Sequence, residues 1–137
     1  MLTYLAAYLI ALLLFVAMDI TWLTTMGAAL YRSTLGDILL PTVRIEPAIA
    51  FYLLFPIGIV VFGVAPALKA QSPLPALIYG GLFGLLAYAT YDLTNHATLR
   101  NWTLKITVID MIYGAVAVAA VSVLTYYVLQ WFGRSGG

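Results

Sequence analysis

Cysteine is absent from this chain, and charged residues are scarce. Its 137 residues contain no Cys, one His, and only 8% Asp, Glu, Lys and Arg. Without cysteine, the chain forms no disulfide, no thiolate nucleophile, no iron–sulfur ligand set and no Cys-type zinc site. A single histidine, His96, does not supply both axial ligands of a bis-histidine haem. We therefore expect no cofactor and no bound metal.

Charge of either sign is too low for a nucleic-acid-binding surface. The formal net charge is +1 and the chain has no basic run, so we expect no nucleic-acid partner. Apolar residues, in contrast, are abundant: 64% of the chain is hydrophobic, and the mean hydropathy is +1.05. A soluble domain of this size does not cover so much apolar surface. The composition indicates an integral membrane protein, with the lipid bilayer as its first partner.

Four apolar stretches are each long enough to cross a bilayer as a helix, which takes about 20 residues. They cover approximately residues 2–26, 47–68, 74–95 and 106–131. We predict an all-α fold with one transmembrane domain over residues 1–137, an antiparallel up-and-down four-helix bundle with short loops. Within the first link, residues 33–40 are expected to form a short amphipathic helical turn at the interface.

Basic residues are distributed unevenly between the two ends of the predicted bundle. One end carries Arg32, Arg44, Arg100 and Lys105. The end that holds the termini carries only Lys69 and Arg134. By the positive-inside rule, the first of these ends is predicted to be cytoplasmic and both termini periplasmic.

Three of the four spans contain one aspartate each: Asp19, Asp92 and Asp110. An ionisable group at the centre of a membrane helix costs about 2.5–3.5 kcal/mol. Antiparallel helices place all three carboxylates within roughly 5–10 Å of the same end of the bundle. If they lie close together they do not all stay ionised, so we expect one to hold a proton or the cluster to hold a cation.

Aromatic and polar side chains share the helix faces of these aspartates, at spacings of three and four residues. The predicted polar site for ligand or proton binding comprises Asp19, Trp22, Tyr88, Tyr91, Asp92, Asn95, His96, Asp110 and Tyr113. For His96 a hydrogen-bonding role is favoured over metal ligation, because one imidazole among oxygen ligands selects no particular metal. Trp22, Trp102 and Trp131 are interpreted first as interface anchors.

The aspartates also have structural interpretations. Asp110 follows Thr107 by three residues, which resembles a capping box and suits the positive end of a helix dipole. Asp19 and Asp92 have no local cap, so a structural role would require basic partners that fix helix register. The predicted charge partners are Arg44, Arg100 and Lys105, together with His96.

Small residues form a stripe on the third span at intervals of four: Ala76, Gly80 and Gly84. Small side chains allow membrane helices to approach closely. We predict helix–helix contact along this stripe and at Gly114 in the fourth span.

Residues 88–95, Tyr-Ala-Thr-Tyr-Asp-Leu-Thr-Asn, followed by Trp102, resemble the signature of a family of small bacterial four-span membrane proteins known only as a domain of unknown function. Residues 19–23, Asp-Ile-Thr-Trp-Leu, share the resemblance, which covers nearly the whole chain. The family pattern usually has Pro after the tryptophan and Trp-Gly after the last aspartate, where this chain has Thr103 and Tyr113-Gly114. The resemblance implies a bacterial inner-membrane protein and no particular activity. Its implied motif residues are Asp19, Trp22, Tyr91, Asp92, Asn95, Trp102 and Asp110.

Three classes of function stay open on this sequence. We favour a small proton- or ion-coupled transporter or ligand-binding protein, because buried carboxylates flanked by aromatic rings suit an amphipathic or cationic ligand. A membrane-embedded enzyme acting on a lipid or isoprenoid substrate would use the aspartates as metal ligands or acid–base groups, although no catalytic motif is recognisable. An accessory or structural subunit of a membrane complex would use them to fix packing. A homodimer or larger complex is open in each case.

Overall fold

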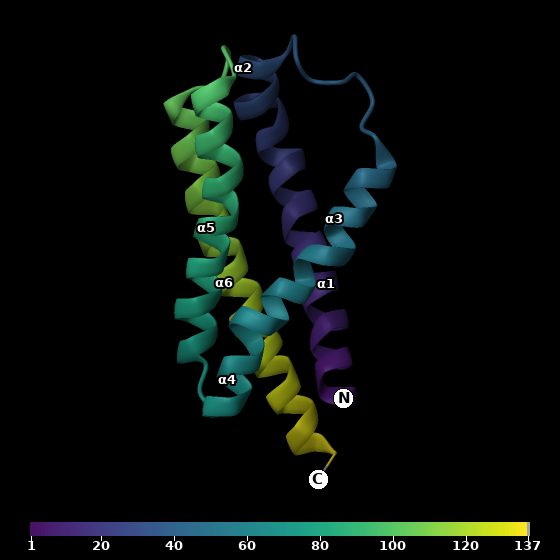
Figure 1. The fold of residues 1–137 in the computed structure, drawn as a ribbon. Coiled ribbons are helices and arrows are strands. Elements are labelled where there is room, and N and C mark those ends of the chain that lie inside the picture. The colour runs from purple at the N-terminus through teal and green to yellow at the C-terminus, as the bar shows by residue number, and fades with distance from the viewer. Residues whose placement is uncertain (137) are drawn as a thin grey trace.

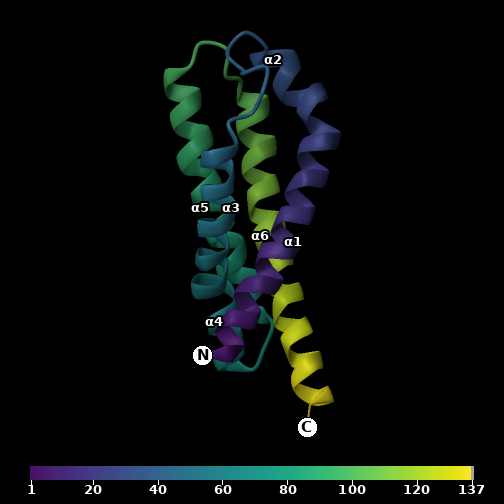
Figure 2. The same ribbon diagram turned by 90° about the vertical axis from the view of Figure 1, so that its right-hand side faces the viewer.

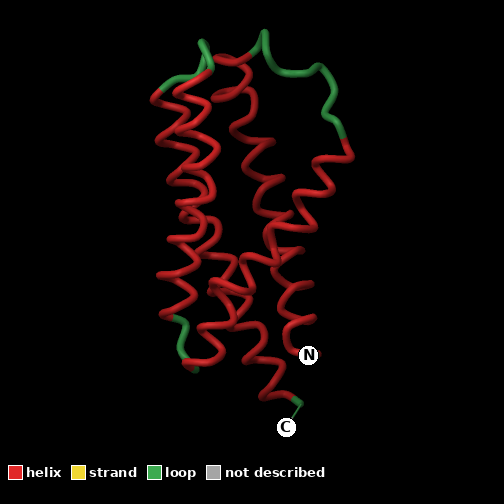
Figure 3. The backbone as a smooth tube through the Cα atoms, viewed as in Figure 1, coloured by secondary structure: helices red, strands yellow, loops and turns green. Residues whose placement is uncertain are grey.

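The computed structural model describes residues 1–136, and four long helices account for most of them. Within residues 1–136 there is no strand (Figure 3). The four helices cover 2–35, 45–70, 74–98 and 104–135, and each is long and apolar enough to cross a membrane. The prediction of an all-α, four-span membrane bundle is confirmed.

Two of the long helices are interrupted by wider, π-helical segments. The first consists of α1 (Leu2–Met26), η1 (Gly27–Arg32) and α2 (Ser33–Leu35). The second consists of α3 (Ile45–Gly58), η2 (Ile59–Val64) and α4 (Ala65–Ala70). The third and fourth are α5 (Leu74–Thr98) and α6 (Leu104–Ser135). All four predicted spans lie inside these helices, which extend beyond them.

The largest difference from the prediction lies after Met26, where a link was expected and the helix instead continues through η1 to Leu35. Packing explains the extension, because Leu30 and Leu35 are buried in one cluster with Trp102 and Ile106. The short amphipathic turn predicted for residues 33–40 is therefore wrong in extent. Helix ends at Leu35, and residues 36–44 are non-helical.

Successive long helices run in opposite directions, and both termini lie at the same end of the bundle (Figure 1). The connections from α2 to α3 and from α5 to α6 lie together at the other end (Figure 1). At the terminal end, α4 turns into α5 through Gln71, whose backbone is left-handed with φ of 52°. Helix α6 packs against α5, α1 and η2, and Figure 2 shows it between α5 and α1. Helix α6 therefore contacts each of the other three long helices.

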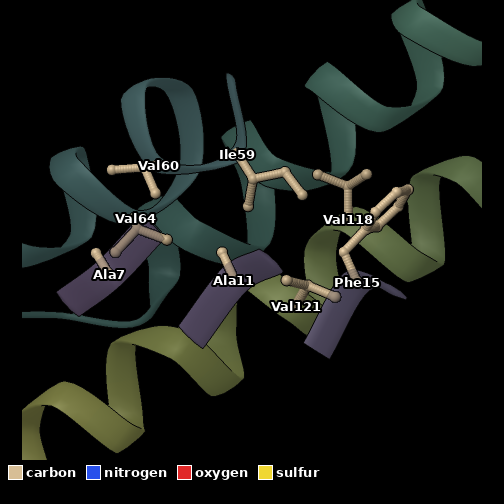
Figure 4. Close-up of a cluster of buried hydrophobic side chains, with 8 residues drawn as sticks. All are labelled: Ala7, Ala11, Phe15, Ile59, Val60, Val64, Val118 and Val121. Carbon is tan, nitrogen blue, oxygen red and sulfur yellow. The ribbon is translucent and has the colours of Figure 1, made fainter. Parts of the chain in front are cut away.

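An apolar cluster fills the crossing of α1, η2 and α6 (Figure 4). Its buried members are Ala7, Ala11, Phe15, Ile59, Val60, Val64, Val118 and Val121. Small Ala7 and Ala11 let α1 lie close to η2, as membrane helices pack through small residues. Large apolar side chains elsewhere, such as Leu13 and Leu86, are exposed on the outer surface, as expected for helices that face lipid.

Helices α5 and α6 approach each other through glycines. A Cβ atom added to Gly84 would lie 2.2 Å from the carbonyl oxygen of Gly114. A Cβ on Gly114 would lie 2.3 Å from Cγ of Tyr88. Ala76, Gly80, Gly84 and Gly114 are all buried, so the small residues lie where these helices meet.

Candidate functional site

The α5–α6 contact also fixes which aspartates face each other. Gly80 packs against Ser122, Gly84 against Val118, and Tyr88 against Gly114. Each step of four residues along α5 therefore matches a step of four residues back along α6. The next pair in this register is Asp92 and Asp110.

Asp92 has no donor for its carboxylate. Its side chain is 0% exposed, and neither oxygen has a hydrogen-bond partner among the described residues. The group that it faces is the carboxyl group of Asp110. Two ionised carboxylates repel each other, whereas a carboxyl group and a carboxylate can share one proton. The two residues form a buried pair of neighbouring carboxyl groups.

Asp110 also accepts a hydrogen bond from a tyrosine, which is itself bound by a tryptophan. The Tyr31 hydroxyl donates a hydrogen bond to Oδ1 of Asp110. The Tyr31 oxygen in turn accepts a hydrogen bond from Nε1 of Trp22 at 3.0 Å. Tyr31 reaches this site only because the helix continues through η1.

Asp19 accepts hydrogen bonds from two tyrosines on two other helices. The Tyr52 hydroxyl in α3 donates to Oδ2, and the Tyr113 hydroxyl in α6 donates to Oδ1 at 3.0 Å. The Tyr113 ring stacks on Trp22, with ring centroids 4.2 Å apart and an interplanar angle of 10°. The stack joins the Asp19 group to the Asp110 group.

The resulting network joins all four long helices. We call it the aspartate–tyrosine network, and its members are Asp19, Trp22, Tyr31, Tyr52, Asp92, Asp110 and Tyr113. Its three aspartates are buried. Because Asp92 and Asp110 each lie six residues inside their helices, they are roughly 9 Å from the loop end of the bundle.

The predicted charge partners do not occupy this network. Arg44, Arg100 and Lys105 are exposed, and phenol hydroxyls bind Asp19 and Asp110 instead. The physical reason is depth, since the basic residues lie in or beside the loops at the end of the bundle. Neutral donors at the level of the aspartates avoid burying a second charge.

The predicted capping role of Asp110 is wrong. Thr103 caps α6 by accepting a hydrogen bond from the backbone N–H of Ile106 at 3.2 Å. Thr107 lies one turn further along and donates to the carbonyl oxygen of Thr103 at 2.9 Å. Asp110 is consequently too far into the helix to serve its first turn, and its hydrogen-bond partner is Tyr31.

The remaining predicted site residues lie at the margin of the network. Tyr88 is half-buried, with its ring edge-on to Tyr113 at 5.9 Å between centroids. Asn95 is half-buried, and Tyr91 and His96 are exposed. The structure thus brings Tyr88 against the network and leaves His96 outside it.

The three tryptophans have three different environments. Trp131 is exposed, as an interface anchor would be. Trp102 is buried, and its Nε1 donates to Oγ1 of Thr107 at 3.1 Å. Trp22 belongs to the network. The anchor interpretation is therefore wrong for Trp102, and for Trp22 it stays a prediction.

Sequence reasoning missed Tyr31 and Tyr52 as site residues. Tyr31 was assigned to the link that follows the first predicted span, residues 2–26. Tyr52 lies five residues after Pro47 in a span without an aspartate. A buried carboxylate needs a hydrogen-bond donor, and the tyrosines near the same end of the bundle were the neutral donors available in the sequence.

A groove of about 490 Å³ runs along α1 beside the network. Its apolar part is formed by Leu14, Ala17 and Met18, and Trp22 and Tyr113 lie at its polar end. No grouping of three His, Asp or Glu side chains suited to a metal ion occurs in the part of the chain that the structure describes. The arrangement therefore offers proton-binding carboxyl groups next to an open, mostly apolar surface.

Comparison with known proteins identifies a family without adding an activity. Searches of curated proteins and of solved structures found no match to this chain. The family described as "Predicted membrane protein (DUF2177)" matches residues 4–127. Four apolar spans and a match over nearly the whole chain show that this protein belongs to that membrane-protein family.

Proposed function

We propose that this protein binds a proton at the Asp92–Asp110 pair and couples that proton to a small amphipathic or cationic ligand, as a small proton-coupled transporter or ligand-binding protein does. The observation that carries the proposal is the position of Asp92. It is fully buried, receives no hydrogen bond within residues 1–136, and faces a second carboxyl group. Two adjacent buried charges repel each other strongly, and one proton removes that repulsion.

The partners of the other aspartates support a proton site. Tyrosine hydroxyls donate to Asp19 and Asp110, and a phenol stabilises a carboxylate without neutralising it. The negative charge of the layer is therefore compensated only in part by hydrogen bonds. A proton or a ligand cation is the natural remaining source of compensation.

The same layer has less in common with the two other functions that the sequence left open. An enzyme with a metal centre built from three protein ligands finds no such group among the described residues, where the carboxylates are arranged as a pair and a single group. An accessory role would use Asp92 as a partner for another side chain, yet it receives no hydrogen bond within the described residues. Of the three functions, we therefore propose the one in which the carboxylates bind protons.

We further propose that the protein lies in a bacterial inner membrane with both termini in the periplasm. The family resemblance of residues 88–95 supports the membrane, and the positive-inside rule supports the orientation. The loop end near the network carries Arg32, Arg44, Arg100 and Lys105. In this orientation the carboxyl pair exchanges its proton with the cytoplasm.

The test is infrared spectroscopy of the purified protein carrying ¹³C-labelled aspartate in lipid nanodiscs. A protonated carboxyl group has a carbonyl stretch that ionised carboxylates lack. We expect this isotope-shifted band at neutral pH in the wild type and in the exposed-loop control Asp37→Asn. We expect its loss in Asp92→Asn. A wild-type spectrum without the band at neutral pH would refute the proton pair.

A further inference from the structure

The groove along α1 is lined by apolar side chains and by threonine hydroxyls, and none of these residues belongs to the carboxyl pair. Leu14, Ala17 and Met18 give it an apolar length, and Thr21 and Thr25 add hydroxyl groups. Thr21 donates its hydroxyl proton to the carbonyl oxygen of Ala17 at 2.8 Å, and Thr25 donates to that of Thr21 at 2.7 Å. Since both protons are used within the helix, the threonines present acceptor lone pairs, not donors, to the groove.

The electrostatic character of the groove favours a positive charge. Its lining includes no Lys, Arg or His, and it includes the aromatic rings of Trp22 and Tyr113. Directly behind Tyr113 lies the Asp19 carboxylate, to which the Tyr113 hydroxyl donates. A carboxylate next to the groove adds negative potential there, and apolar walls open to the bilayer suit a ligand that dissolves in lipid.

Trp22 connects the groove to the carboxyl pair. It lines the groove, and its indole N–H donates to Tyr31. An indole nitrogen only donates, so the Tyr31 oxygen accepts there, and the single hydroxyl proton of Tyr31 goes to Asp110. Asp110 thus has a hydrogen-bond donor, whereas Asp92 has none within the described residues. Asp92 is therefore the member of the pair on which the proposed function places the proton.

We infer that the α1 groove binds a lipophilic organic cation from the bilayer, and that Trp22 links its occupancy to release of the proton held on Asp92. The inference rests on the proposed function and adds the ligand class and the coupling residue. The positive charge in the groove takes over part of the compensation that the proton supplies. Asp92 then loses its proton to water at the loop end of the bundle. The positive charge of the bound cation thus replaces the positive charge of the proton.

Among the titratable groups around the pair, Asp19 is the one carboxylate, and both of its oxygens already accept hydrogen bonds from Tyr52 and Tyr113. These groups are Asp19 from α1, Tyr31 from η1, Tyr52 from α3, Tyr88 and Tyr91 from α5, and Tyr113 from α6. Binding of the cation and binding of the proton should therefore oppose each other. By linkage, each ligand weakens the other by the same factor.

The first experiment measures binding of tetraphenylphosphonium to the full chain in nanodiscs, with the isosteric anion tetraphenylborate as the matched probe. We expect the cation to bind at least about tenfold more tightly than the anion relative to empty nanodiscs. We expect the Kd of the cation to fall by up to about tenfold per pH unit as the pH rises through the titration of the pair. A pH-sensitive dye in weak buffer should report up to one proton released per bound cation.

Three variants test the site and its coupling. Ala17→Phe fills the groove at an exposed position, so the Kd for the cation should rise at least about tenfold. Leu13→Phe, on an exposed part of α1 outside the groove lining, is the matched control and should leave the Kd unchanged. Trp22→Phe keeps an aromatic ring and removes the N–H donor, so binding should persist while its pH dependence falls at least about threefold.

The outcomes separate this inference from the proposed function. Equal binding of the two ions, or a Kd indifferent to Ala17→Phe, would overturn the cation site. A Kd that does not change with pH, while the infrared band of Asp92 is present, would overturn the coupling and leave the proton pair standing. Absence of that band refutes the proposed function whatever the probes do.

Discussion

The indole ring of Trp22 lies nearly parallel to the phenol ring of Tyr113, at 4.2 Å between centroids. This stack connects two hydrogen-bonded groups that share no direct hydrogen bond. Trp22 donates towards Tyr31 and Asp110, whereas Tyr113 donates to Asp19. The two hydrogen-bonded groups are therefore in contact through this pair of rings.

Removing one phenol donor from Asp19 should destabilise the bundle. Tyr52→Phe leaves the Asp19 carboxylate with Tyr113 as its remaining donor. Because hydrogen bonds to charged groups contribute more than neutral ones, we expect a loss of about 1.5–3 kcal/mol in the free energy of unfolding. Reversible unfolding in mixed detergent micelles measures it. Tyr127→Phe, at an exposed position, should have no effect, and equal losses in the two variants would contradict the role of Tyr52.

The closest approach of α5 and α6 should tolerate no added methyl group. Gly84→Ala would place its Cβ 2.2 Å from the carbonyl oxygen of Gly114, which forces the helices apart. We expect a loss of about 1–3 kcal/mol in stability, measured as a lower Tm in detergent. Gly133→Ala is the control, because nothing lies within 4 Å of its added Cβ, and it should be neutral or slightly stabilising. A Gly84→Ala protein as stable as the wild type would mean that the helices are not in this contact.

The stability of the wild type should fall as the pH rises through the loss of the shared proton. The folded pair holds one proton because its two carboxyl groups face each other, whereas the separated groups of the unfolded chain release theirs more readily. A folded state that binds more protons than the unfolded state loses stability with rising pH. Thermal unfolding from about pH 4 to about pH 9 measures this. Asp92→Asn should reduce that decline while remaining folded, and an unchanged decline in the variant would assign it to another group.

Trp102 and Trp131 should respond differently to the same substitution. Trp102→Phe removes the hydrogen bond to Thr107 and reduces packing at a buried position. We expect a loss of about 1–3 kcal/mol, because a buried acceptor loses its donor. Trp131→Phe changes an exposed ring and should leave the Tm within about 2 °C of the wild type. If the two variants lose the same stability, Trp102 is not buried as the structure has it.

Much of the fold follows from the sequence, because a bilayer restricts the choice so strongly. Long apolar stretches must be helical where they contact lipid, and short links between them require antiparallel neighbours. The stripe from Ala76 to Gly84 also lies where small residues were expected to allow close approach. The ends of the helices were less predictable. Leu30 and Leu35 continue the first helix because they pack against Trp102, a residue far away in the chain.

The sequence was enough to predict the carboxylates of the site, but not the hydrogen-bond donors that bind them. Asp19, Asp92 and Asp110 were identified because charge in an apolar run is costly wherever it occurs. Their hydrogen-bond donors depend on helix rotation and on the path of the chain after Met26, which periodicity alone does not give. Arginine and lysine were the obvious partners by charge. Tyrosines took that place because their hydroxyls reach the aspartates from neighbouring helices at the same depth.

The helical path from Asp19 through η1 to Tyr31 does not tolerate an insertion or a deletion. Each residue removed from a helix rotates everything beyond it by about 100°. Deleting one residue between Gly27 and Tyr31 would turn the tyrosine away from Asp110, while α1 stayed anchored through Asp19 and Trp22. This stretch can therefore exchange residues over evolutionary time far more readily than it can lose or gain one. The connection at residues 36–44 is not helical and carries no network residue. Insertions and deletions should therefore be tolerated there more readily than between Asp19 and Tyr31.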